Sequence, residues 1–192
     1  MVSISDKSNY LDLPDKPKQK MKPEKLSDLK RELLNHNVHE LTEICLRLAK
    51  YKKENKELLN YLLFDSESPM DYTDQVKNFL TEDFKNLQKH YFYSTKSLRK
   101  IIRLMNRYAK YTGSKEAETE LCLWFCTNYL NYADLKTNHK ALQGLLTRQL
   151  EKAAKLILKL HEDLQFDYRQ EFDQIVQRAE KETGWFNSRN FM

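Results

Sequence analysis

The chain has 192 residues, of which 40% are hydrophobic and 32% are charged, and its formal net charge is +5. This length suits one domain with a substantial core, whereas three glycines and four prolines are too few for the frequent turns of an all-β fold. An odd number of cysteines and no recognisable signal peptide lead us to expect reduced thiols and a cytoplasmic location. We expect no membrane segment, because no apolar run approaches about 18 residues.

The first third of the chain is predicted to contain a tail and then short helices. Residues 1–24 carry three of the four prolines and five lysines, so we expect a disordered basic tail there. A short leucine-rich helix should follow. Asn37 and Glu40 have the spacing of a capping box, which predicts a helix start at residue 38. A polar break at 52–55 precedes the apolar run 58–64.

The middle of the chain carries clearer helix boundaries. Ser68 followed by Pro69 predicts an N-cap, and the apolar period then continues as far as Tyr91. The next helix should end at Gly113, a typical left-handed stop, and Ser114 should cap its successor. That successor contains the six apolar residues 121–126, which predicts a helix buried in the centre of the fold.

From residue 139 to residue 182, the pattern fits one long helix or two helices broken near Gln165, and Gly184 should end it. The segment 162–182 holds seven acids against three bases. In total we expect an all-α fold of six to eight antiparallel helices at 25–184, with a short C-terminal tail at 185–192. Two architectures fit this count: a HEAT-like array of α-α hairpins, which we favour, and a closed irregular bundle.

Catalytic and metal-binding patterns are weak throughout. Cys122 and Cys126 lie four residues apart, but their apolar neighbours favour core positions over zinc ligands. The cluster at 161–167 reads as a solvated polar face, since adjacent residues do not share one side of a helix. No glycine-rich phosphate loop or nucleophile elbow is present. We therefore expect a non-enzymatic protein with no cofactor, metal or small-molecule substrate.

The most informative feature is a concentration of positive charge on one predicted helix. Residues 93–112 contain six cations and no acid. At about 100° per residue, these cations fall within an arc of roughly 100°, opposite an apolar face. We call them the first cationic row: Lys96, Arg99, Lys100, Arg103, Arg107 and Lys110. Helix surfaces usually intersperse acids for i,i+4 support, so this row predicts an anionic partner unless it is solvated or is neutralised by the segment 162–182.

A second cationic row follows on a later helix, within an arc of about 60°. Its members are Arg148, Lys152, Lys155 and Lys159. Tyr93 and Tyr111 flank the first row, where aromatic rings could stack on bases. Two partners fit: an anionic protein, which would make the chain a binding or scaffold module, and nucleic acid contacted by both rows. If the two rows share one surface, phosphate contact is favoured; if they lie on opposite sides, or abut the segment 162–182, a protein scaffold is favoured.

Three runs within residues 38–172 carry a resemblance to known proteins. The runs ICLRLAKYKKENKELLNYLLF, SLRKIIRLMNRYAKYTGSKEAETELCLWFC and LHEDLQFDYR resemble a small family of uncharacterised bacterial helical proteins. The resemblance implies a bacterial cytosolic setting and no catalytic residue. The amphipathic hairpins also look like HEAT-type folds, which generally bind proteins or nucleic acids.

Overall fold

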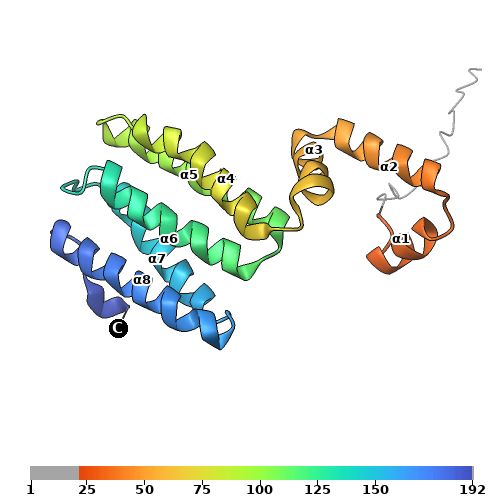
Figure 1. Cartoon of the computed structure of the whole chain (residues 1–192). Helices are drawn as coiled ribbons and strands as arrows, with labels where there is room; N and C mark the ends of the chain where they lie inside the picture. The colour runs from red at the N-terminus through yellow and green to blue at the C-terminus, as the bar shows by residue number, and fades with distance from the viewer. Residues whose placement is uncertain (1–21, 192) are drawn as a thin grey trace, which may run out of the picture. The chain divides into compact units, whose positions relative to one another are not determined.

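The computed structural model describes residues 22–191, which form helices joined by short connections and contain no β-strand (Figure 1). The all-α prediction is therefore confirmed. The predicted tail at 1–24 lies almost wholly outside the described residues. The helices are α1 (Leu26–Leu33), α2 (Val38–Tyr51), α3 (Lys53–Asn60), the π-helix η1 (Tyr61–Asp65), α4 (Pro69–Lys85), α5 (Tyr91–Thr112), α6 (Lys115–Tyr132), α7 (Lys140–Ile157), α8 (Glu162–Glu182) and the 3₁₀ turn η2 (Ser188–Asn190).

The chain divides into two compact units, one extending to Leu46 and the other beginning at Arg47 within α2. In the first unit, α1 buries no side chain, and neither does α2 at any point along its length. Leu26 and Val38 are among the most exposed apolar residues of the described chain. The second unit contains the core and both cationic rows.

The helix boundaries predicted from local capping are confirmed. Asn37 and Glu40 form the reciprocal capping box, with the Asn37 N–H donating to Glu40 Oε2 at 2.9 Å and the Glu40 N–H donating to Asn37 Oδ1 at 3.0 Å. Ser114 accepts a hydrogen bond from the Ala117 N–H at 3.2 Å. Gly113 has a φ of 62°, the left-handed conformation expected at a helix C-terminus.

Two predicted boundaries were wrong. The helix expected to reach Tyr91 ends at Lys85, where the side chain of Asn86 folds back and donates to Glu82 O at 2.8 Å, and Tyr91 instead begins α5. The long segment 139–182 breaks at 158–161 rather than near Gln165. There, the His161 side chain accepts from the Asp163 N–H at 3.4 Å and caps α8, so that Gln165 lies in its first turns.

The core of the second unit is built around α6, which contacts α4, α5, α7 and α8. The hairpin α4–α5 packs against α6–α7, and both α6 and α7 pack against α8 (Figure 1), an arrangement that fits a helical bundle as well as an array of hairpins. Five of the six residues at 121–126 are buried, as expected for a central helix. Trp124 is the exception: it is only partly buried and meets Phe84 edge-to-face, with ring centroids 5.3 Å apart.

The segment predicted to be a short C-terminal tail packs against the same core as far as residue 191. Trp185 Nε1 donates to Leu135 O at 3.0 Å. Phe186 is buried, and its ring stacks on that of Phe191 at a centroid distance of 5.4 Å. The ring of Phe191 also lies 6.0 Å, between centroids, from that of Phe172 in the middle of α8, so the segment belongs to the folded unit.

Candidate interface for an anionic macromolecule

Helix α5 presents the first cationic row because its opposite face is anchored in the core. Leu98 and Ile101 are fully buried, and Met105 is only 1% exposed. A helix buried on one side exposes the positions about half a turn away. All members of the first cationic row are exposed except Arg107, which is partly buried.

The second cationic row lies beside the first, because α7 packs against α5. Lys152 Nζ on α7 donates to Asn106 Oδ1 on α5 at 2.7 Å. A surface hollow is lined by Arg99, Arg103, Arg107 and Lys110 from α5 and by Arg148 from α7. The two rows therefore share one surface, which we call the α5–α7 cationic surface.

Two further hollows extend this surface in both directions. One continues along α7 and is lined by the whole second cationic row together with Lys115. The other lies near the start of α5 and is lined by Tyr93, Lys96 and Arg99, among others. Arg148 lies over Gly144, and its Nη1 would be 2.9 Å from any Cβ at that position. A larger residue at position 144 would require the end of the Arg148 side chain to shift.

Three cations of the two rows already have carboxylate partners. Arg107 contacts Glu54 Oε1 through Nη1 and Glu57 Oε2 through Nη2, both at 3.2 Å. Lys100 Nζ lies 3.0 Å from Asp83 Oδ1. These pairs join α5 to α3 and α4, so part of the first cationic row has a role in the fold.

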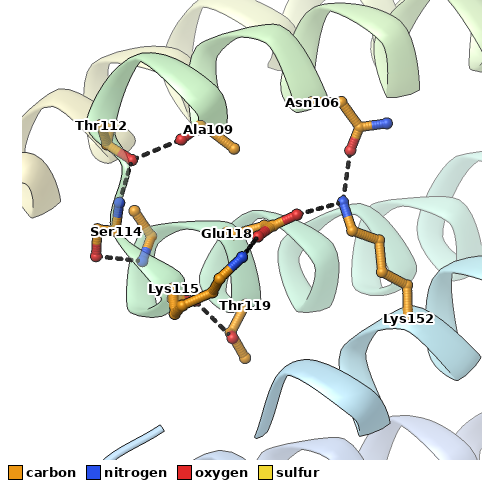
Figure 2. A network of polar contacts seen from close by, with 9 residues as sticks. Asn106, Ala109, Thr112, Ser114, Lys115, Glu118, Thr119 and Lys152 are labelled. Carbon is orange, nitrogen blue, oxygen red and sulfur yellow. Dashed lines mark hydrogen bonds and ion pairs between the residues drawn. The ribbon is translucent and has the colours of Figure 1, made fainter. Parts of the chain in front are cut away.

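Lys152 is the third paired cation, and its contacts form the network in Figure 2. Glu118 lies between two ammonium groups, with Oε1 2.9 Å from Lys152 Nζ and Oε2 2.9 Å from Lys115 Nζ. Burial of Glu118 disfavours its charged form, but the hydrogen bonds from Lys152 and Lys115 outweigh burial and lower the pKa of the carboxyl. Lys152 of α7 is thus held by Asn106 of α5 and by Glu118 of α6.

The remaining cations of both rows are exposed, and none forms an ion pair with any residue in the range 22–191. They are Lys96, Arg99, Arg103, Lys110, Arg148, Lys155 and Lys159. Seven unpaired cations on one surface repel each other, and folding does not require such an arrangement. This subset is the part of the surface available to a partner.

The acidic segment 162–182 does not neutralise either row. Within the described chain its ion pairs stay inside α8 or its cap, as in Arg169 with Asp173 and Arg178 with Glu182. One of its two partly buried acids, Glu171, has Glu120 of α6 and Lys77 of α4 as its charged neighbours. The carboxylates that meet the cationic rows come instead from α3, α4 and α6.

Replacing Glu171 with glutamine should raise the melting temperature near pH 7. Burial, reinforced by Glu120 and opposed by Lys77, raises the pKa of Glu171. A carboxyl whose folded pKa is raised stabilises the fold below its unfolded pKa and loses that contribution as pH rises through the folded pKa. We expect Glu171→Gln to gain about 1–3 °C near pH 7 and almost nothing near pH 4. Thermal unfolding of the exposed-site control Asp167→Asn should show no such pH dependence.

The two tyrosines predicted to flank the first row have different environments. Tyr93 is 50% exposed and lines the hollow near the start of α5. The Tyr111 hydroxyl instead bonds with Glu54 O at 3.1 Å and with Glu57 Oε2 at 3.2 Å. Burial, together with Glu57, raises the pKa of Tyr111 to about 12. Tyr111 therefore fastens α3 to α5, which leaves its ring poorly placed for stacking on a base.

Phe92 is a residue of this surface that the sequence reasoning missed. It is 58% exposed and lines the same hollow as Tyr93. The signal was present in the sequence, because three consecutive aromatic residues, 91–93, come immediately before the first cationic row. Three consecutive rings spread over more than half of the helix circumference, so a helix that is buried on one side only cannot bury all of them.

Cys122 and Cys126 occupy the core, as their apolar neighbours indicated. Burial raises the pKa of Cys122 to about 11 and that of Cys126 well above its usual range, so both thiols are protonated and poorly reactive at neutral pH. Among residues 22–191, no group of three or more histidine, cysteine or acidic side chains is placed to hold a metal ion. No helix in this range is long and apolar enough to cross a membrane.

No protein-family model, curated protein or solved structure matches the chain.

Proposed function

We propose that this chain is a non-enzymatic helical binding module that engages an anionic macromolecule through the α5–α7 cationic surface. The observation that carries the proposal is the convergence of the two cationic rows on one surface. Seven exposed cations of these rows have no ion pair among the described residues. Exposed like charges lower stability slightly, and a polyanion that neutralises several of them releases its counterions and gains affinity.

Nucleic acid is the anionic partner that this arrangement supports best. The unpaired cations extend along two neighbouring helices and through three adjoining hollows. A phosphate backbone presents negative charge at regular short intervals, so it can follow such an extended surface from one hollow to the next. Phosphate contacts of this kind supply affinity without requiring a particular base sequence.

An acidic protein helix is the second candidate, and one contact within the molecule favours it. Glu54 and Glu57 are three residues apart on α3, and both reach the guanidinium of Arg107. A partner helix with acids at the same spacing could contact Arg103 or Arg99 in the same way. In this reading, the protein would be a scaffold that assembles with acidic helices.

The triple variant Arg99→Gln, Arg103→Gln, Arg148→Gln tests the proposal. Fluorescence anisotropy with a labelled oligonucleotide should show at least about tenfold weaker binding than wild type at low salt, because phosphate contacts are lost. Between about 50 and 200 mM salt, the slope of log K against log salt should flatten by about 2 to 3, or nearly one per contact removed.

The matched control replaces three exposed lysines that line none of these hollows. It is the triple variant Lys56→Gln, Lys136→Gln, Lys181→Gln. It has the same net charge as the arginine triple variant and should bind almost as wild type does. Equal losses in both variants would mean that net charge alone attracts the oligonucleotide. Binding to polyglutamate but to no oligonucleotide would replace nucleic acid with an acidic protein as the partner, and binding to neither would remove the proposal.

A further inference from the structure

We infer that the α5–α7 cationic surface takes single-stranded nucleic acid, with bases stacking on Phe92 and Tyr93. The inference rests on the proposed function and names the form of nucleic acid that this surface fits. It depends on two exposed aromatic rings that share a hollow with Lys96, Arg99 and Arg103.

The two rings are exposed where folding offers no reason for them to be. Phe92 is 58% exposed and Tyr93 is 50% exposed, although they are consecutive residues of α5. Isolated exposed aromatic residues are common, but adjacent ones next to several unpaired cations are characteristic of surfaces that bind unpaired bases. Each base offers a flat face to an aromatic ring, and each phosphate offers a charge to an arginine.

The start of α5 is held in a defined conformation by a stack of rings. The ring of Tyr91 stacks with that of His139, at a centroid distance of 3.4 Å and an interplanar angle of 14°, and with that of His90, at 4.9 Å and 28°. His90 also accepts a hydrogen bond from the Phe92 N–H through Nδ1 at 3.3 Å. Phe92 and Tyr93 meet edge-to-face at 5.4 Å. The two exposed rings are thus ordered before a base arrives, which reduces the entropy lost on binding.

The cations next to these rings continue through the other two hollows and offer a path to a sugar–phosphate backbone, although the third hollow is also lined by the carboxylates of Glu118 and Glu151. Arg99 and Arg103 line both the aromatic hollow and the hollow between α5 and α7. Arg148 lines that second hollow and also the third one, which ends at Lys155 and Lys159. A strand whose bases stack on Phe92 and Tyr93 can therefore run across Arg103 and Arg148 toward the end of α7.

A duplex could use the cations but not the rings. The base faces in a double helix are already stacked on their neighbours, and exposing one of them costs unstacking energy. Stacking on protein side chains is accordingly a feature of single-strand binding, in both DNA and RNA. The rings therefore predict a preference for single strands, whereas the cations contribute to the binding of either form.

The test compares the double variant Phe92→Leu, Tyr93→Leu with wild type, using one labelled oligonucleotide as a single strand and as a duplex. We expect single-strand affinity to fall at least about tenfold, because two stacked bases are lost, and duplex affinity to stay within about twofold. Wild type should bind the single strand more tightly than the duplex at the same salt concentration. Phe166→Leu, at an exposed phenylalanine on α8 away from the surface, should change neither affinity, and far-UV circular dichroism checks that each variant folds.

The outcomes separate this inference from the function on which it rests. Oligonucleotide binding that weakens in the arginine triple variant but not in the double leucine variant would overturn the stacking inference and leave the proposed function intact. A wild-type preference for the duplex would overturn it in the same way. No binding to either oligonucleotide would overturn both proposals.

Discussion

Replacing Phe125 with alanine should lower the free energy of unfolding by about 3–5 kcal/mol. Phe125 is fully buried on α6. The centroid of its ring lies 5.5 Å from that of Phe84 and 6.4 Å from that of Tyr129. Because α6 contacts four other helices, a cavity there cannot be filled by moving one of them alone. Urea denaturation followed by far-UV circular dichroism measures the loss.

Two controls make this result specific to the centre of the core. Phe166→Ala removes the same side chain from a site that is 75% exposed, and it should cost less than about 1 kcal/mol. Trp124→Ala should fall between the two, because Trp124 lies at the edge of the same helix face and is only partly buried. A loss below about 1 kcal/mol at Phe125 would contradict the central position of α6.

The parts of the fold that could be predicted from the sequence are those set by near neighbours in the chain. The capping box at Asn37 needs only Glu40, and the cap at Ser114 needs only the backbone N–H of Ala117. Which face of α5 is buried in the core likewise follows from the apolar period of the helix itself. Such features depend on residues within about four positions, so their physical causes are visible without a structure.

Weak local signals and contacts between distant segments decided the rest. The break before α8 contains no proline or glycine, and its N-cap, His161, is not one of the residue types usually found there, so the break was hard to place from the sequence. Arg103 and Arg107 are equivalent by helical period, yet only Arg107 meets α3, whose contacting acids precede it in the chain by about 50 residues. The division of the first cationic row into paired and unpaired members therefore could not be predicted from the row itself.

This division predicts that Arg107→Gln should lower the free energy of unfolding by about 1–2 kcal/mol, whereas a helix surface without partners would predict no change or a slight gain. The side chain of Arg107 is 24% exposed and holds Glu54 and Glu57, which attach α3 to α5 together with Tyr111. Removing the guanidinium leaves Glu54 without an ion pair among the described residues and leaves Glu57 with Lys53 alone, at 3.6 Å. Two features limit the stabilisation that Arg107 provides in the wild type. Its Nε is buried without a hydrogen-bond partner among the described residues, and Glu54 is half exposed. Chemical denaturation measures the difference.

Arg103→Gln is the matched control, because it makes the same chemical change one turn earlier on α5, at an exposed arginine with no ion pair in the described part of the chain. It should change stability by less than about 0.5 kcal/mol and weaken oligonucleotide binding, so the two variants should separate stability from binding. Limited proteolysis adds a local measurement: cleavage within α3 should accelerate in Arg107→Gln but not in Arg103→Gln, since only the former loosens that helix. Equal stabilities for the two variants would show that the contacts of Arg107 with α3 do not hold in solution, and Arg107 would then join the seven unpaired cations as part of the surface open to a partner.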